Sequence, residues 1–153
     1  MRSLRAVTVL VALGLASLGA CGDDDDGGAE ALTKAEFIDR GDDICRAAAE
    51  DGEDLDAPES TTEDLSRYLT EAQELLTDAA ADFEALQPPA DGEEVQRLYL
   101  AALRDTVDLL GDAKAAAEDG DLQTALGIVQ DSDPQAEARG PLQTYGFEVC
   151  GSA

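Results

Sequence analysis

Histidine and tryptophan are absent from this chain of 153 residues, and basic residues are few. Without histidine the chain lacks the side chain that most often serves as a general base and as a metal ligand, so Ser-His-Asp and Cys-His catalysis are excluded. Lys and Arg number 10 against 35 Asp and Glu, which gives a net charge of −25. Because such a surface repels phosphate backbones, we expect no nucleic-acid binding.

Aromatic residues are also scarce, at 4% of the chain, whereas apolar residues as a whole make up 44%. Strong acidity can mark disorder, but this apolar fraction is enough for a core, which must be rich in Ala and Leu. The length has room for one domain. Neither a Gly-rich phosphate loop nor a Cys-x-x-Cys pair is present. We therefore expect no catalytic residue, no cofactor and no metal site.

The N-terminus has the features of an export signal. Arg2 and Arg5 precede an apolar run over residues 6–16. This run is shorter than the roughly 18 residues of a membrane-spanning helix, and small residues follow it, as in secretory signal peptides. We expect residues 1–20 to be a signal peptide.

The four residues Leu18-Gly19-Ala20-Cys21 resemble the bacterial lipobox. That resemblance implies that diacylglycerol, with acyl chains such as palmitate, is joined to the Cys21 sulfur and that the chain is cleaved before Cys21. The alternative is an ordinary cleaved signal peptide with a free Cys21, although Leu18 stands where ordinary cleavage prefers a small residue. We expect a lipid-anchored protein on the extracytoplasmic face of the cell membrane.

Residues 21–31 are expected to form a flexible acidic tether, because a run of Gly and Asp repels itself and has nothing to bury. The four carboxylates of residues 23–26 could be imagined as a calcium site, but adjacent Asp side chains splay apart, so a solvated spacer is the better interpretation. Loss of Arg2 and Arg5 would leave 8 basic and 35 acidic residues, a net charge of −27.

Helical periodicity covers residues 32–153, which we expect to form one domain. An unbroken heptad pattern of apolar positions occurs in two long segments, separated by Pro88-Pro89. In the first it comprises Leu65, Leu69, Ala72, Leu76, Ala79, Phe83 and Leu86. In the second it comprises Val95, Tyr99, Ala102, Thr106, Leu109, Ala113 and Ala116. The chain is predicted to be all-α, an up-and-down helical bundle of three to four main helices around a long antiparallel helix hairpin.

Capping signals place the helix starts. Thr33 with Glu36 and Asp91 with Glu94 have the spacing of capping boxes. Ser60 and Thr61, each with an acidic residue three positions later, offer caps for the first long segment. A shorter helix is expected to start after Asp121.

The C-terminal part of the chain is more broken. Asp133 before Pro134 is expected to restart the last helix, and Gly140-Pro141 to kink or split it. Gly146 resembles a C-terminal glycine cap. Residues 147–150 are expected to run extended along the bundle.

Several short motifs together resemble small uncharacterised lipoproteins of actinobacteria. They are the lipobox, the acidic linker, Phe37-Ile38 eight residues before Cys45, Leu86-Gln87-Pro88-Pro89-Ala90, and residues 145–151. The resemblance implies a helical domain with two cysteines at the cell envelope. It carries no established activity, substrate or catalytic residue.

The chain has three cysteines, and lipid on Cys21 would leave two of them, Cys45 and Cys150, as a possible pair. We predict a disulfide between Cys45 and Cys150, because export places them in an oxidising compartment. It would close a loop of about 105 residues and contribute roughly 4 to 5 kcal/mol in the chain-entropy model. The alternatives are two separate buried thiols, or a redox-active pair, which the wide sequence spacing disfavours.

Other residues that could carry chemistry have simpler interpretations. The pairs Asp42-Asp43 and Glu93-Glu94 point apart on a helix and are expected to form solvated faces. Tyr68 and Tyr99 could stack on a ligand, but their spacing favours core packing.

Two functions remain open. The first is a non-catalytic binding or interaction module of the cell envelope, with an envelope protein or a cell-wall component as partner. The second is an envelope enzyme or redox protein, which the missing histidine and the missing close cysteine pair disfavour.

Overall fold

The computed structural model describes residues 30–58 and 61–152, and the expected signal peptide and Cys21 lie outside these ranges. Within them the chain is all-helical, without strands, which confirms the predicted fold class. The helices are α1 (Lys34–Glu53), α2 (Thr62–Ala85), α3 (Glu93–Glu118), α4 (Leu122–Asp131) and α5 (Ala136–Tyr145). None of these helices combines the length and the apolar composition that a bilayer span would need.

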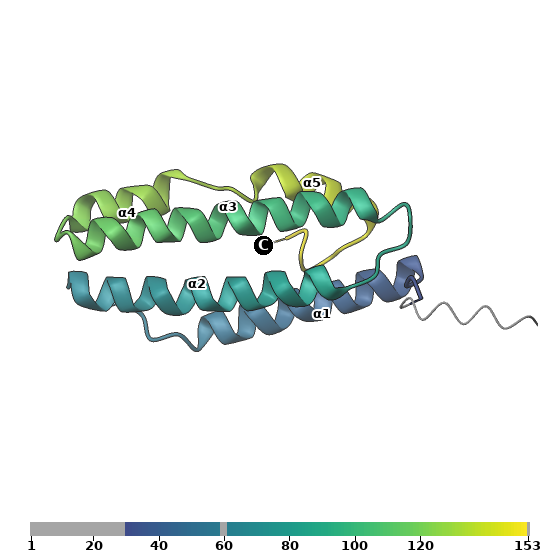
Figure 1. Ribbon diagram of the computed structural model, residues 1–153, viewed down its shortest axis with the longest axis horizontal. Coiled ribbons are helices and arrows are strands. Elements are labelled where there is room, and N and C mark those ends of the chain that lie inside the picture. The colour runs from purple at the N-terminus through teal and green to yellow at the C-terminus, as the bar shows by residue number, and fades with distance from the viewer. Residues whose placement is uncertain (1–29, 59–60, 153) are drawn as a thin grey trace, which may run out of the picture.

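The long hairpin of α2 and α3 forms the centre of the bundle (Figure 1). At 1.5 Å per residue its arms of 24 and 26 residues are about 36 and 39 Å long. The first helix, α1, packs on α2, whereas α4 and α5 follow one another along α3 and together make a fourth arm. Four antiparallel arms therefore surround the core.

Side chains cap three of the helices as predicted. Thr33 and Glu36 form a reciprocal capping box on α1, with 3.3 Å from the Glu36 amide nitrogen to Thr33 Oγ1. The Asp64 amide donates to Thr61 Oγ1 at the start of α2. The Asp121 carboxylate accepts the amide of Thr124 at the start of α4.

The predicted capping box of Asp91 and Glu94 is wrong. Gly92 is the cap residue of α3 and makes no side-chain capping bond. The Asp91 carboxylate instead accepts a hydrogen bond from the Tyr145 hydroxyl, 3.4 Å away. A Cβ on Gly92 would lie 2.8 Å from that hydroxyl oxygen and 3.2 Å from the Phe37 ring, so close packing at this turn requires glycine.

The boundary between α4 and α5 also differs from expectation. Gln135, not Asp133, is the cap residue of α5, and the Asp133 carboxylate binds Arg139. Pro141 lies inside α5, so the break falls before this helix and not at residues 140–141. Gly146 caps the helix as predicted, with φ of 125° and its amide bonded to the Leu142 carbonyl oxygen.

The core divides into two clusters that meet at Leu76. One cluster, here called the aromatic end, contains most of the buried rings, and its buried side chains come from α1, α2, α3, α5 and the C-terminal tail. It comprises Phe37, Cys45, Phe83, Val95, Tyr99, Leu100, Ala102, Leu103, Ala138, Leu142, Phe147 and Cys150. The other, the alanine-rich end, has buried side chains only from α2, α3 and α4. It comprises Leu65, Leu69, Leu110, Ala113, Ala117 and Ala125.

Candidate functional site

Among the described residues, Asp42 on α1 is the charged residue that is buried, with 7% of its surface exposed. It accepts three backbone hydrogen bonds from the C-terminal tail, from the amides of Glu148 (2.8 Å), Val149 (2.9 Å) and Cys150 (3.0 Å). The prediction that Asp42 and Asp43 both belong to a solvated face is therefore wrong for Asp42. Asp43 is exposed and pairs with Arg46.

The tail after Gly146 does not run extended, as the sequence suggested, but makes turns. The turns follow from Asp42, because three consecutive amides converge on one carboxylate and an extended chain would point alternate amides in opposite directions. Gln143 adds a bond of 2.6 Å from its side-chain amide to the Gly151 carbonyl oxygen.

The structure brings together the two cysteines that the sequence paired. Their sulfur atoms lie 1.93 Å apart, at disulfide distance, and their Cα atoms 5.4 Å apart. Cys45 lies one helical turn after Asp42, so one face of α1 presents both the covalent and the hydrogen-bonded attachment of the tail. Since Cys45 is 7% exposed and Cys150 1%, the pair is shielded from external thiols.

Aromatic rings surround this junction. Phe37 lies edge-on to Phe83 and to Phe147, with centroids 5.8 and 5.4 Å apart. A Cβ on Gly41 would lie 2.6 Å from Phe147 and 2.8 Å from Phe83, so glycine lets both rings approach α1. Because Gly41 has no side chain, the aromatic rings pack directly against the backbone of α1.

The two tyrosines predicted to pack in the core differ in burial. Tyr99 is 6% exposed and its hydroxyl lies 3.0 Å from Cys45 Sγ, whereas Tyr68 is half-buried against the alanine-rich end. Burial, and to a smaller extent the nearby Asp42 charge, raise the pKa of Tyr99 to about 12. Tyr99 is therefore a neutral core residue at physiological pH.

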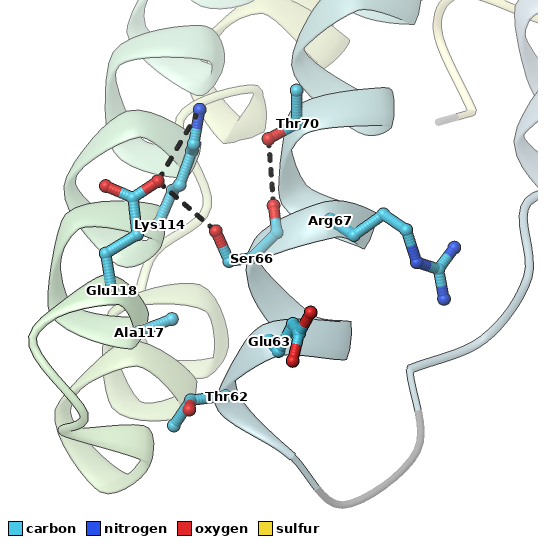
Figure 2. A pocket seen from close by; sticks show the side chains of 8 residues that line it. All are labelled: Thr62, Glu63, Ser66, Arg67, Thr70, Lys114, Ala117 and Glu118. Carbon is cyan, nitrogen blue, oxygen red and sulfur yellow. Dashed lines mark hydrogen bonds and ion pairs between the residues drawn. The ribbon is translucent and has the colours of Figure 1, made fainter.

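A surface depression of about 450 Å³ lies at the other end of the hairpin, between the start of α2 and the end of α3. Figure 2 shows Lys114 and Glu118 of α3 turned toward Ser66 and Thr70, while Arg67 points away from them. The Ser66 hydroxyl donates to Glu118 Oε1 over 3.4 Å, and Lys114 Nζ lies 3.9 Å from the same oxygen. These contacts are long and the groups are partly exposed to solvent. The depression is therefore a polar surface patch, and no nucleophile in it is aligned with a base.

A second depression, of about 350 Å³, lies between α1 and α2. Its floor is apolar and its edges carry aspartates. The lining residues are Asp43, Ile44, Ala47, Ala48, Asp51, Leu75, Asp78, Ala79 and Asp82. We call this depression the α1–α2 groove.

Possible metal ligands are dispersed over the described residues, where no group of three or more Asp, Glu or Cys side chains could hold an ion. A scan with protein-family models, a search of curated proteins and a search of solved structures found no match to this chain. Its fold and surface define a small acidic all-α bundle with a tail pinned to the first helix.

Proposed function

We propose that this protein is a membrane-anchored extracytoplasmic lipoprotein that acts as a non-catalytic binding or interaction module of the cell envelope. The observation that carries the proposal is Cys21 at the end of the lipobox-like residues 18–21, directly after a basic start and an apolar run. Lipid on Cys21 supplies the membrane anchor, and the helical domain is displayed outside the membrane.

The position of α1 sets how the domain would be displayed. Lys34, where α1 begins, lies at the same end of the bundle as the turn between α2 and α3 (Figure 1). The intervening dozen or so residues after Cys21 could reach at most about 40 Å. A lipid at Cys21 would therefore be attached at the aromatic end of the bundle, and the polar depression around Lys114 lies at the opposite end.

The chemistry of the surface supports binding more than catalysis. The polar depression is open and its charged groups are partly exposed, so their interactions are screened by water. The strongly acidic surface repels nucleic acids and anionic lipid headgroups, which leaves basic or neutral envelope proteins and cell-wall components as the favoured partners.

Anchoring is tested with the full-length chain in a bacterial host that processes lipoproteins. The expected mature protein begins at Cys21, carries a diacylglyceryl mass and partitions into the detergent phase. Cys21→Ala is expected to leave an uncleaved precursor, whereas the control Gly22→Ala is processed normally. A lipid-free mature chain that begins at another residue would contradict the proposal.

A further inference from the structure

The α1–α2 groove combines an apolar floor with acidic edges. Ile44, Ala48, Leu75 and Ala79 are half-buried, so their exposed faces line a depression that no other described segment covers. Ile44 also packs against the aromatic end, which gives the groove a fixed wall. An apolar depression bounded by a few charged groups has the composition of a small-molecule site.

The edges of the groove carry one sign of charge. Asp43 and Asp51 come from α1. Asp78 and Asp82 come from α2, where they lie one helical turn apart from each other. Arg46 pairs with Asp43. The side chains of Asp51, Asp78 and Asp82 have no hydrogen-bond or ion-pair partner among residues 30–58 and 61–152. Three carboxylates around an apolar floor thus lack compensating charge.

We propose that the α1–α2 groove binds a small organic cation with an apolar body. The apolar part covers the side chains of Leu75 and Ala79, and the positive group lies beside the carboxylates of Asp78 and Asp82, one helical turn apart on α2. This inference deepens the proposed binding role, on which it rests, by naming a class of ligand. It does not depend on the lipid at Cys21.

Charge and size select this ligand over other occupants. A second copy of the chain, an anionic lipid and a nucleic acid all bring negative charge to edges that already repel one another. The groove volume of about 350 Å³ is at the lower end of the range for small-molecule pockets, which suits a molecule of one ring or a short alkyl chain. Asp78 and Asp82 lie about 6 Å apart along α2, which is within the length of such a molecule.

The test uses equilibrium dialysis of benzyltrimethylammonium against the full chain as the cell processes it, at low ionic strength. Tetramethylammonium supplies the charge without the apolar body, and benzoate supplies the ring with the opposite charge. Benzyltrimethylammonium is expected to bind at least about tenfold more tightly than either probe. Equal binding of both cations would overturn the proposal, because it would show only diffuse attraction to the acidic surface.

Paired variants locate the site. Asp78→Asn with Asp82→Asn is expected to weaken binding about tenfold. The control, Asp108→Asn with Asp112→Asn, removes two exposed charges at the same spacing on α3 and should change binding less than about twofold. Equal weakening by both pairs would overturn the assignment to this groove.

A change to the floor tests the apolar contact separately. Ala79→Leu fills the groove and is expected to abolish binding, whereas Ala81→Leu, exposed on the same helix outside the groove, should leave binding unchanged. Helicity measured by circular dichroism verifies that both variants fold. Retained binding in Ala79→Leu would contradict the proposal. Loss of membrane anchoring in Cys21→Ala would leave the dialysis result unaffected, so the two proposals fail independently.

Discussion

The two ends of the bundle hold together in different ways. In the aromatic end, rings from α1, α2, α3 and the tail interlock around Asp42 and the paired cysteines. In the alanine-rich end, α2, α3 and α4 pack through leucines and buried alanines, without a cross-link between distant segments. A buried alanine methyl contributes about 0.8 kcal/mol, whereas a buried Phe contributes about 2 to 3 kcal/mol. The comparison shows that periodicity alone is enough to pair helices, whereas fixing a tail requires specific long-range contacts.

The largest effect is expected when the covalent attachment of the tail is removed. Replacement of both Cys45 and Cys150 by Ala should lower the free energy of unfolding by about 4 kcal/mol, because the pair closes a loop with a sequence separation of 105. Denaturant unfolding monitored by circular dichroism measures this change. A loss below about 1 kcal/mol would mean that the aromatic end gains little from this cross-link.

The hydrogen-bonded attachment is tested by Asp42→Ala. This change leaves three tail amides without their acceptor and should lower the free energy of unfolding by about 3 kcal/mol. The matched control is Asp43→Ala, which removes an exposed carboxylate from the same helix and should change stability by less than about 0.5 kcal/mol. If the two variants lose equal stability, the three bonds have no special role.

Alkaline pH tests the burial of Tyr99. The pKa of Tyr99 is about 12 in the folded protein, against an ordinary value of 10.0 for a tyrosine. Because the unfolded chain loses this proton first, the stabilising contribution is complete below pH 10 and disappears as the pH rises to about 12. Between pH 10 and about 12, the free energy of unfolding of the wild-type chain should fall by about 2 kcal/mol more than that of Tyr99→Phe. Identical pH profiles in unfolding titrations would show that Tyr99 titrates as an exposed phenol.

The smallest difference between a variant and its control, about 1 kcal/mol, is expected in the alanine-rich end. Ala113 is 0% exposed, and Ala113→Gly should lower the free energy of unfolding by about 2 kcal/mol, half from lost helix propensity and half from the buried methyl. Ala115→Gly, at an exposed position of the same helix, should lower it by about 1 kcal/mol. Thermal melts of the two variants measure the difference, and equal melts would mean that the methyl of Ala113 makes no useful contact.

Much of the fold was predictable because helix periodicity and capping are local. The heptad pattern located α2 and α3, and Thr33, Thr61 and Asp121 marked three helix starts. On α3 the buried face is wider than the heptad positions alone. Leu103 and Leu110, which lie beside the heptad positions, are buried because α4 and α5 cover a second side of this helix. Thr106, a heptad position, is only half-buried.

The tail junction could be predicted only in part. Counting cysteines identified the pair, since an exported chain with Cys21 lipidated has two left. Asp42 gave no such signal, because Asp43 beside it is the same residue type, and only a tail 106 residues away distinguishes them. Asp91 likewise had the spacing of a cap but is bonded to Tyr145 from the far end of the sequence. The lipid on Cys21 remains a prediction.

The difference between the two ends is tested most directly by native-state hydrogen exchange in the tail. The amides of Glu148, Val149 and Cys150 lie outside any helix, where exchange is normally fast. Because Asp42 accepts all three, they should exchange at least about 100-fold more slowly than unprotected amides, and Asp42→Ala should remove this protection. Unprotected exchange of these amides in the wild-type chain would contradict the account of a pinned tail.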